Sequence, residues 1–140
     1  MITPHGAVTD VAAVAAHYDD LDLFTKRWGT HVHHVYWKTG KENRQEAVLN
    51  LTRLVAEQAR VQPGDRVCDM GCGYGATAMV LARDYKAKVT ALTVSQRQYD
   101  FARSRNSGPA GLDFLLRDAL DNQLEAESFD RVISIEAPSI

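Results

Sequence analysis

The segment VCDMGCGYGATAMVLA, residues 67–82, constrains the fold of this chain more than any other. Its glycines Gly71, Gly73 and Gly75 alternate with other residues between an apolar run and a stretch with helical spacing. Glycine accepts positive φ and lets a ligand approach the backbone closely, so the segment predicts a strand, a ligand-binding turn and a helix. A tight strand-to-helix turn without a ligand also favours glycine, and this purely structural explanation stays open.

Strands and helices are expected to alternate along the rest of the chain. Apolar spacing predicts helices over residues 42–60 (starting at Glu42 or Asn43), 76–84 and 95–104, and strands over 66–70, 88–94, 112–116 and 131–135. Upstream, the pattern favours helices over 11–18 and 21–28 and an extended aromatic segment over 31–37. Alternation of this kind implies parallel strands joined by right-handed crossovers, so the expected fold class is α/β, doubly wound, with helices on both faces of a mostly parallel sheet.

The composition excludes several classes of protein. With 140 residues, 24% of them charged, and a net charge of -2, the chain lacks the basic footprint of a nucleic-acid-binding protein. Its apolar runs fall short of the roughly 20 residues that a membrane span needs, and the N-terminus does not resemble a signal peptide, so a cytoplasmic protein is expected. Cys68 and Cys72 have no second cysteine pair, which favours free thiols in a reducing compartment.

A ligand of the glycine loop would lie at the carboxyl ends of the strands, where the strand order reverses. The dinucleotide fingerprint is G-x-G-x-x-G with an acid about 20 residues later. This loop reads G-x-G-x-G, and the second strand ends in Thr93, Val94 and Ser95 without a carboxylate, so both departures disfavour a nicotinamide cofactor. Asp69, just before the loop, would repel a pyrophosphate and favour an ammonium or sulfonium group.

These motifs resemble those of class I S-adenosylmethionine-dependent methyltransferases. Residues 67–82 are similar to the first motif of that family, and VTALTVSQRQYDFAR, residues 89–103, is similar to the T-L-S-x-x-Q segment of its branch of cyclopropane-fatty-acid synthases and tocopherol-type small-molecule methyltransferases. The resemblance implies S-adenosylmethionine as cofactor, S-adenosylhomocysteine as product and a small-molecule methyl acceptor. It covers only the cofactor half of the family, so a Rossmann-like sheet truncated after about four strands is expected, either as part of a longer enzyme or as a relative that pairs with another chain.

The resemblance implies cofactor contacts from the glycine loop and from the next two strand ends. Those residues are Asp69, Gly71, Cys72, Gly73, Gly75, Thr93, Val94, Gln98, Asp118 and Ala119. Thr93 and Gln98 are expected on the ribose and methionine side, and Asp118 on the adenine amino group, for which a carboxylate is a suitable acceptor. Structural alternatives remain, since Ser95 and Gln98 match a capping box and Asp118 is typical of turns.

Residues 1–42 resemble the lid of the same branch, which folds over the cofactor, and residues 43–140 correspond to the cofactor-binding domain. Tyr18 and His33 are then further cofactor contacts. Metal binding by His31, His33 and His34 is the alternative, but alternation along a strand puts only two of them on one face, which is too few ligands.

Glu136 ends the fourth expected strand and is the candidate catalytic base, although a salt bridge explains an exposed acid there equally well. The short sheet predicts an exposed edge that a second copy or a partner chain would cover. Besides methyl transfer, three functions stay open: cyclopropane formation with the same cofactor, nicotinamide-dependent oxidoreduction, and a non-catalytic binding or assembly module.

Overall fold

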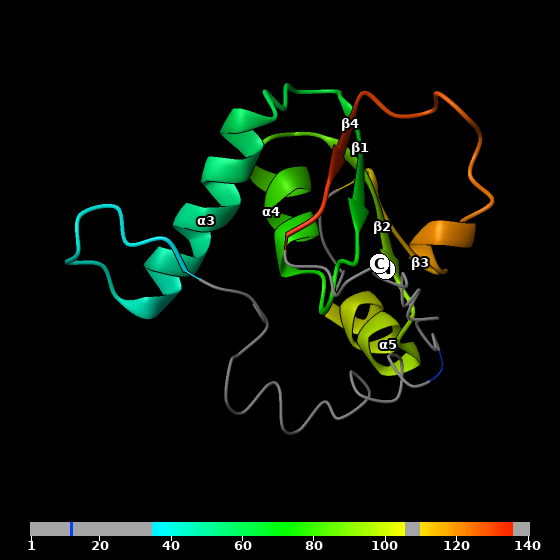
Figure 1. The fold of residues 1–140 in the computed structure, drawn as a ribbon, viewed down its shortest axis with the longest axis horizontal. Helices are drawn as coiled ribbons and strands as arrows, with labels where there is room; N and C mark the ends of the chain where they lie inside the picture. Colours follow the sequence, from blue (N-terminus) through cyan, green and yellow to red (C-terminus); the bar gives the residue numbers. More distant parts are fainter. Residues whose placement is uncertain (1–11, 13–34, 106–109, 136–140) are drawn as a thin grey trace, which may run out of the picture.

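A computed structural model describes residue 12, residues 35–105 and residues 110–135 of the chain (Figure 1). Apart from Ala12, which is helical, the expected helix over 11–18 lies outside the described residues, as do the expected helix over 21–28 and most of the extended segment over 31–37. The described elements are α3 (Arg44–Gln58), β1 (Arg66–Met70), α4 (Ala76–Asp84), β2 (Lys88–Thr93), α5 (Gln96–Arg105), β3 (Leu112–Leu116), the 3-10 helix η1 (Ala119–Asp121) and β4 (Arg131–Ile133).

The four strands form one parallel sheet in the order β3-β2-β1-β4. From β1 the chain adds β2 and then β3 on one side, and it returns to add β4 on the other side. The strand order therefore reverses at β1, which confirms the doubly wound α/β fold. The carboxyl ends of β1, β2 and β3 lie at the same edge of the sheet, because all the pairings are parallel.

Two strands end earlier than the sequence predicts. β2 stops at Thr93 instead of Val94, because Ser95 Oγ accepts a hydrogen bond from the Gln98 N–H and so caps the start of α5. β4 stops at Ile133 instead of residue 135, and its last pair with β1 is Asp69 with Ile133, so Met70 of β1 has no paired residue in β4. The cap of α5 thus explains the end of β2, and apolar character alone does not extend β4.

The three α-helices among the described residues pack on one face of the sheet. Their small and apolar residues Ala56, Ala78, Leu81 and Ala102 contact the strand residues that alternate toward them, Val67, Val89, Ala91, Leu112 and Phe114. α3 and α4 lie side by side, and the buried hydroxyls of Thr52 and Thr77 are 3.4 Å apart between them (Figure 1).

The opposite face of the sheet is less covered in the described part of the chain. Val132 on this face is 58% exposed, and Asp113 is also exposed. The crossover from β3 to β4 contains η1 and lies across the strands from α3 and α4 in Figure 1. The return of the chain to the other side of β1 thus occurs over this second face, as a right-handed crossover requires.

Gly75 is required by the core. It has a φ of +85°, and a Cβ atom built on it would lie 2.6 Å from Phe114 Cζ and 3.1 Å from Ala102 Cβ. Real side chains do not approach so closely, so only glycine lets the start of α4 pack against β3 and α5 at this distance. The structural explanation of the loop glycines therefore applies to Gly75.

Replacing Gly75 with alanine is expected to reduce the free energy of unfolding by about 2–4 kcal/mol, from positive-φ strain plus overpacking against Phe114. Urea denaturation followed by circular dichroism measures the loss. Gly64→Ala is the matched control, because Gly64 has a φ of +84° and its Cβ would meet nothing within 4 Å. Equal losses in the two variants would contradict the packing role of Gly75.

Candidate functional site

Backbone hydrogen bonds bring three segments together at the carboxyl edge of the sheet. The N–H groups of Gly71 and Cys72 donate to the carbonyl of Leu92, at 3.0 and 2.8 Å, and so fold the glycine loop over the end of β2. The Arg117 N–H donates to the carbonyl of Thr93 at 2.9 Å, so the chain leaving β3 continues beside the same strand end. The glycine loop, the β2–α5 junction and the start of η1 therefore lie in sequence along one edge.

The glycine loop turns through three positive φ angles: 77° at Gly71, 55° at Gly73 and 85° at Gly75. A Cβ built on Gly73 would meet no atom within 4 Å, so this residue borders open space rather than packed protein. α4 begins at Ala76 without a side-chain cap, which leaves N-terminal backbone donors of the helix to another partner. A loop with these features leaves room for a ligand that closely approaches its backbone.

Asp69 supplies the strongest polar feature of the site. It lies in β1 between Ala91 and Ile133 of the flanking strands, and it is only 2% exposed. Its Oδ2 has no hydrogen-bond partner among the residues that the structure describes. Burial raises the pKa of this carboxyl group from 3.8 to about 7. The sequence alone suggests a permanent negative charge here, whereas the environment holds Asp69 close to the balance between its neutral and charged forms.

An orphaned buried oxygen of this kind requires an explanation, because buried polar groups are nearly always hydrogen-bonded. A ligand with an ammonium or sulfonium group would fit, since it would satisfy Oδ2 and stabilise the charged carboxylate. The residues present therefore fit a cationic ligand of the glycine loop, and they fit a pyrophosphate less well.

Both cysteines are free and buried. Burial, with a further contribution from the charge of Asp69, raises the pKa of Cys68 to about 11 and that of Cys72 well above the usual value. The thiols are therefore protonated near neutral pH and are poor nucleophiles or metal ligands. In the described ranges, His, Cys, Asp and Glu form no group of three that could hold a metal ion.

The β2–α5 junction contains a buried hydrogen-bond network. The Gln98 N–H donates to Ser95 Oγ at 3.2 Å, which forms one half of the expected capping box. The Gln98 side chain instead contacts the strand end, where the Thr93 hydroxyl donates to Oε1 at 2.9 Å. Val94, between the two, is half-buried. The Thr93–Gln98 bond is a feature that the capping pattern does not predict.

Asp118 has the structural role that the sequence left open as an alternative. Its Oδ1 accepts from the Leu120 N–H at 2.9 Å and caps η1, whose first residue is Ala119. One capping bond uses only part of the acceptor capacity of a carboxylate. Three other predicted site residues, Tyr18, His33 and Glu136, lie outside the described residues.

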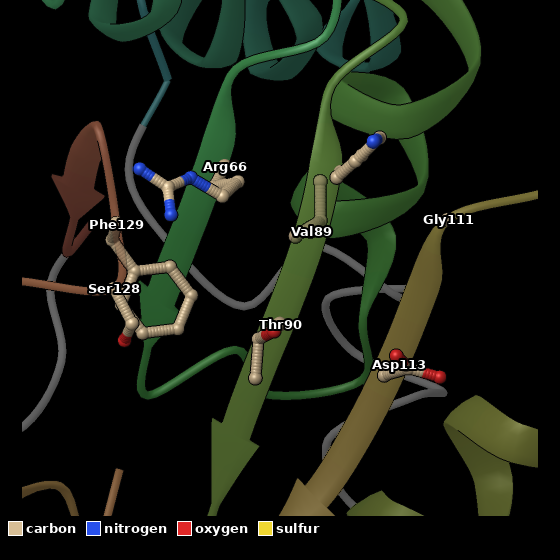
Figure 2. Close-up of a pocket in the computed structure, with 8 residues that line it drawn as sticks. Arg66, Val89, Thr90, Gly111, Asp113, Ser128 and Phe129 are labelled. Carbon is tan, nitrogen blue, oxygen red and sulfur yellow. The ribbon is translucent and has the colours of Figure 1, made fainter. Parts of the chain in front are cut away.

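A separate hollow of about 360 Å³ lies at the opposite edge of the sheet, near the amino ends of the strands (Figure 2). Its lining includes Arg66 and Lys88 at strand starts, Thr90 and Asp113 on the less covered face, and Phe129 before β4. None of the predicted site residues lines it. Because ligands of such sheets bind at the carboxyl edge, the glycine-loop edge remains the candidate site.

The chain matches the mycolic acid cyclopropane synthetase family over residues 5–139, and it belongs to this family. An O-methyltransferase of Penicillium expansum is 34% identical over 139 residues, which cover 95% of this chain and 49% of that protein. The structure of this chain resembles that of a mycolic acid cyclopropane synthase complexed with SAH and CTAB, with 30% identity, a TM-score of 0.78, and coverage of 96% of this chain and 46% of that one.

The cyclase SpnF is also similar, with 35% identity, a TM-score of 0.76, and coverage of 85% of this chain and 47% of that one. The chain spans about half the length, or less, of the curated relatives it matches. These matches confirm the family that the sequence motifs resemble, and they confirm that the chain corresponds to only part of a family member. No helix in the described ranges is long and apolar enough to cross a membrane.

Gly73→Ala is expected to weaken binding of S-adenosylhomocysteine at least 10-fold, because the new methyl group would occupy the open space beside the loop. The expected stability loss is only about 1 kcal/mol, from the positive φ. Isothermal titration and urea denaturation separate the two effects. Unchanged affinity in a folded Gly73→Ala protein would show that the ligand does not pass over this residue.

The raised pKa of Asp69 predicts a pH dependence of stability with a definite sign. Its stabilising contribution is complete below pH 3.8 and is lost as pH rises through about 7, because the folded state retains a proton that the unfolded chain releases. The difference in free energy of unfolding between wild type and Asp69→Asn should therefore fall by a few kcal/mol between pH 4 and 7. Denaturation at several pH values measures it, and a constant difference would contradict the buried, unpartnered carboxyl.

Proposed function

We propose that this chain forms the S-adenosylmethionine-binding half of a methyltransferase that acts on a small molecule. The observation that carries the proposal is the unpartnered buried oxygen of Asp69, in the strand that leads into a glycine loop that borders open space at Gly73. Membership of a family that uses S-adenosylmethionine supports the same cofactor, and so does a structural relative complexed with SAH.

Each element of the edge has a proposed role. The loop residues Gly71, Cys72, Gly73 and Gly75 would surround the methionine part of the cofactor. Asp69 would accept a hydrogen bond from its ammonium group, Gln98 would bind the ribose, and Asp118 with Ala119 would bind the adenine. The proposed lid, residues 1–42, would add contacts from Tyr18 and His33 to the cofactor-binding domain of residues 43–140.

When bound, S-adenosylmethionine supplies a methyl group that is already activated by a positively charged sulfur. The contribution of the chain is then mainly to bind and orient the reactants. An acceptor that must lose a proton also needs a base close to the reacting centre, and Glu136 is proposed for that role. The net reaction transfers the methyl group to the acceptor and leaves S-adenosylhomocysteine.

Formation of a cyclopropane ring on a lipid is the second candidate, because the matching family is that of mycolic acid cyclopropane synthetases. Both reactions would use the same cofactor edge. The similarity to the cyclase SpnF shows that the fold alone does not fix the reaction. Turnover assays with small-molecule and lipid acceptors distinguish the two candidates.

We also propose a cytoplasmic location. The free, buried cysteines support a reducing compartment, and cell fractionation tests this proposal.

β3 and β4 are the two edges of the described sheet, so a second copy or a partner chain is proposed to pair with one of them, which the mass in solution tests.

Isothermal titration of the protein with S-adenosylhomocysteine, with NAD as the control ligand, tests the proposed cofactor. Micromolar affinity for S-adenosylhomocysteine and no measurable heat with NAD are expected, because Asp69 favours a cationic group and disfavours a pyrophosphate. Tight binding of NAD alone by the folded protein would replace this proposal with a nicotinamide-dependent function. Binding of S-adenosylhomocysteine without turnover of any acceptor would favour a non-catalytic module.

A further inference from the structure

The network at the β2–α5 junction is almost completely removed from solvent. Thr93, Ser95 and Gln98 are 4%, 0% and 4% exposed. The Thr93 hydroxyl accepts from the Ser95 N–H at 3.2 Å and donates to Gln98 Oε1 at 2.9 Å, while Ser95 Oγ accepts from the Gln98 N–H at 3.2 Å. Three residues thus hold one another by three buried hydrogen bonds at the edge where the candidate ligand lies.

The direction of these hydrogen bonds decides which end of the Gln98 amide group is left to bind a ligand. A hydroxyl group has one proton, and Thr93 uses it on Gln98 Oε1. The oxygen end of the Gln98 amide therefore faces Thr93, which leaves the nitrogen end, with its two N–H donors, for another partner. No hydrogen bond to Gln98 Nε2 is found among the residues that the structure describes.

We propose that Thr93 is a positioning residue that does not hold the cofactor itself. It fixes the Gln98 amide in the orientation that presents N–H donors to an acceptor oxygen of the ligand, such as a ribose hydroxyl. This inference rests on the proposed function, and it changes the expectation that Thr93 and Gln98 both contact the cofactor. Without Thr93, the amide would be free to rotate and to present its oxygen instead.

The backbone supports this assignment. Thr93 is the last residue of β2 and is paired with Leu116 of β3, so its position is fixed by the sheet. Gln98 lies in the first turn of α5, whose start is fixed by the Ser95 cap. The hydroxyl of Thr93 thus joins two rigid elements. What remains variable is the rotation of the Gln98 amide group, and the bond from the Thr93 hydroxyl selects one orientation of that group.

A double-mutant cycle tests the inference, with the affinity for S-adenosylhomocysteine as the readout. Thr93→Val removes the hydroxyl at nearly constant shape and is expected to weaken binding about 10-fold, whereas Thr93→Ser keeps the hydroxyl and should bind like wild type. Gln98→Ala should weaken binding at least as much. If Thr93 acts through Gln98, the double variant binds no more weakly than Gln98→Ala alone.

Two further variants keep the test independent of stability. Thr52→Val removes another buried hydroxyl, one paired with Thr77 between α3 and α4, and should leave the affinity unchanged. Gln98→Glu keeps an oxygen for the Thr93 hydroxyl but replaces the N–H donors, so it should weaken binding as Gln98→Ala does. Affinity of Gln98→Glu equal to wild type would overturn the assigned direction of the bond.

The outcomes separate this inference from the proposed function. If the wild-type protein binds S-adenosylhomocysteine and the losses of Thr93→Val and Gln98→Ala add, Thr93 contacts the ligand directly and the positioning role is wrong. The positioning role is also wrong if Thr93→Val binds like wild type, because the hydroxyl would then contribute nothing to binding. If the folded wild-type protein does not bind S-adenosylhomocysteine, the proposed function fails and this inference fails with it.

Discussion

The carbonyl group of Leu92 holds the candidate site together. It accepts hydrogen bonds from two successive loop residues, Gly71 and Cys72, and so draws the chain that leaves β1 across the end of β2. Turning this sharply requires positive φ, which glycine supplies at three alternating positions. The turn leads directly into α4, whose N-cap is Gly75. One acceptor on a neighbouring strand thus anchors the path of the loop between β1 and α4.

Two of the three loop glycines have different roles, although the sequence presents all three as one motif. Gly75 is packed against Phe114, a residue of β3 that is distant in sequence, and serves the core. Gly73 borders open space and serves the ligand in the proposed function. A side chain on the first would disturb folding, and a side chain on the second would disturb binding.

The sequence predicts the elements well where local signals mark both ends. The Pro63–Gly64 turn before β1 and the glycine loop after it define that strand, and the bounds of α4 and β3 also agree with expectation. The prediction is less accurate where distant residues decide. β4 ends at Ile133, where its pairing with β1 stops, and η1 is a three-residue helix stabilised by one Asp118 cap.

For the site, the sequence predicts which segments meet at the carboxyl edge but not how their side chains pair. The spacing of Ser95 and Gln98 indicates a reciprocal capping box, yet the Gln98 side chain bonds the Thr93 hydroxyl. That choice depends on the angle between β2 and α5, which no local pattern records. The raised pKa of Asp69 likewise follows from its enclosure by neighbouring strands and helices, and not from its place in the motif.

In the proposed function, Asp69 would let this edge of the sheet select ligands by charge. An unpartnered buried carboxylate is costly, and Asp69 avoids part of that cost by retaining its proton. A ligand with a positive group removes the reason for protonation, because it stabilises the charged form and satisfies Oδ2. An anionic ligand has the opposite effect and must bind against the carboxylate. The low dielectric of the interior raises the cost of the isolated charged carboxylate, and it also strengthens the attraction between that carboxylate and a cation.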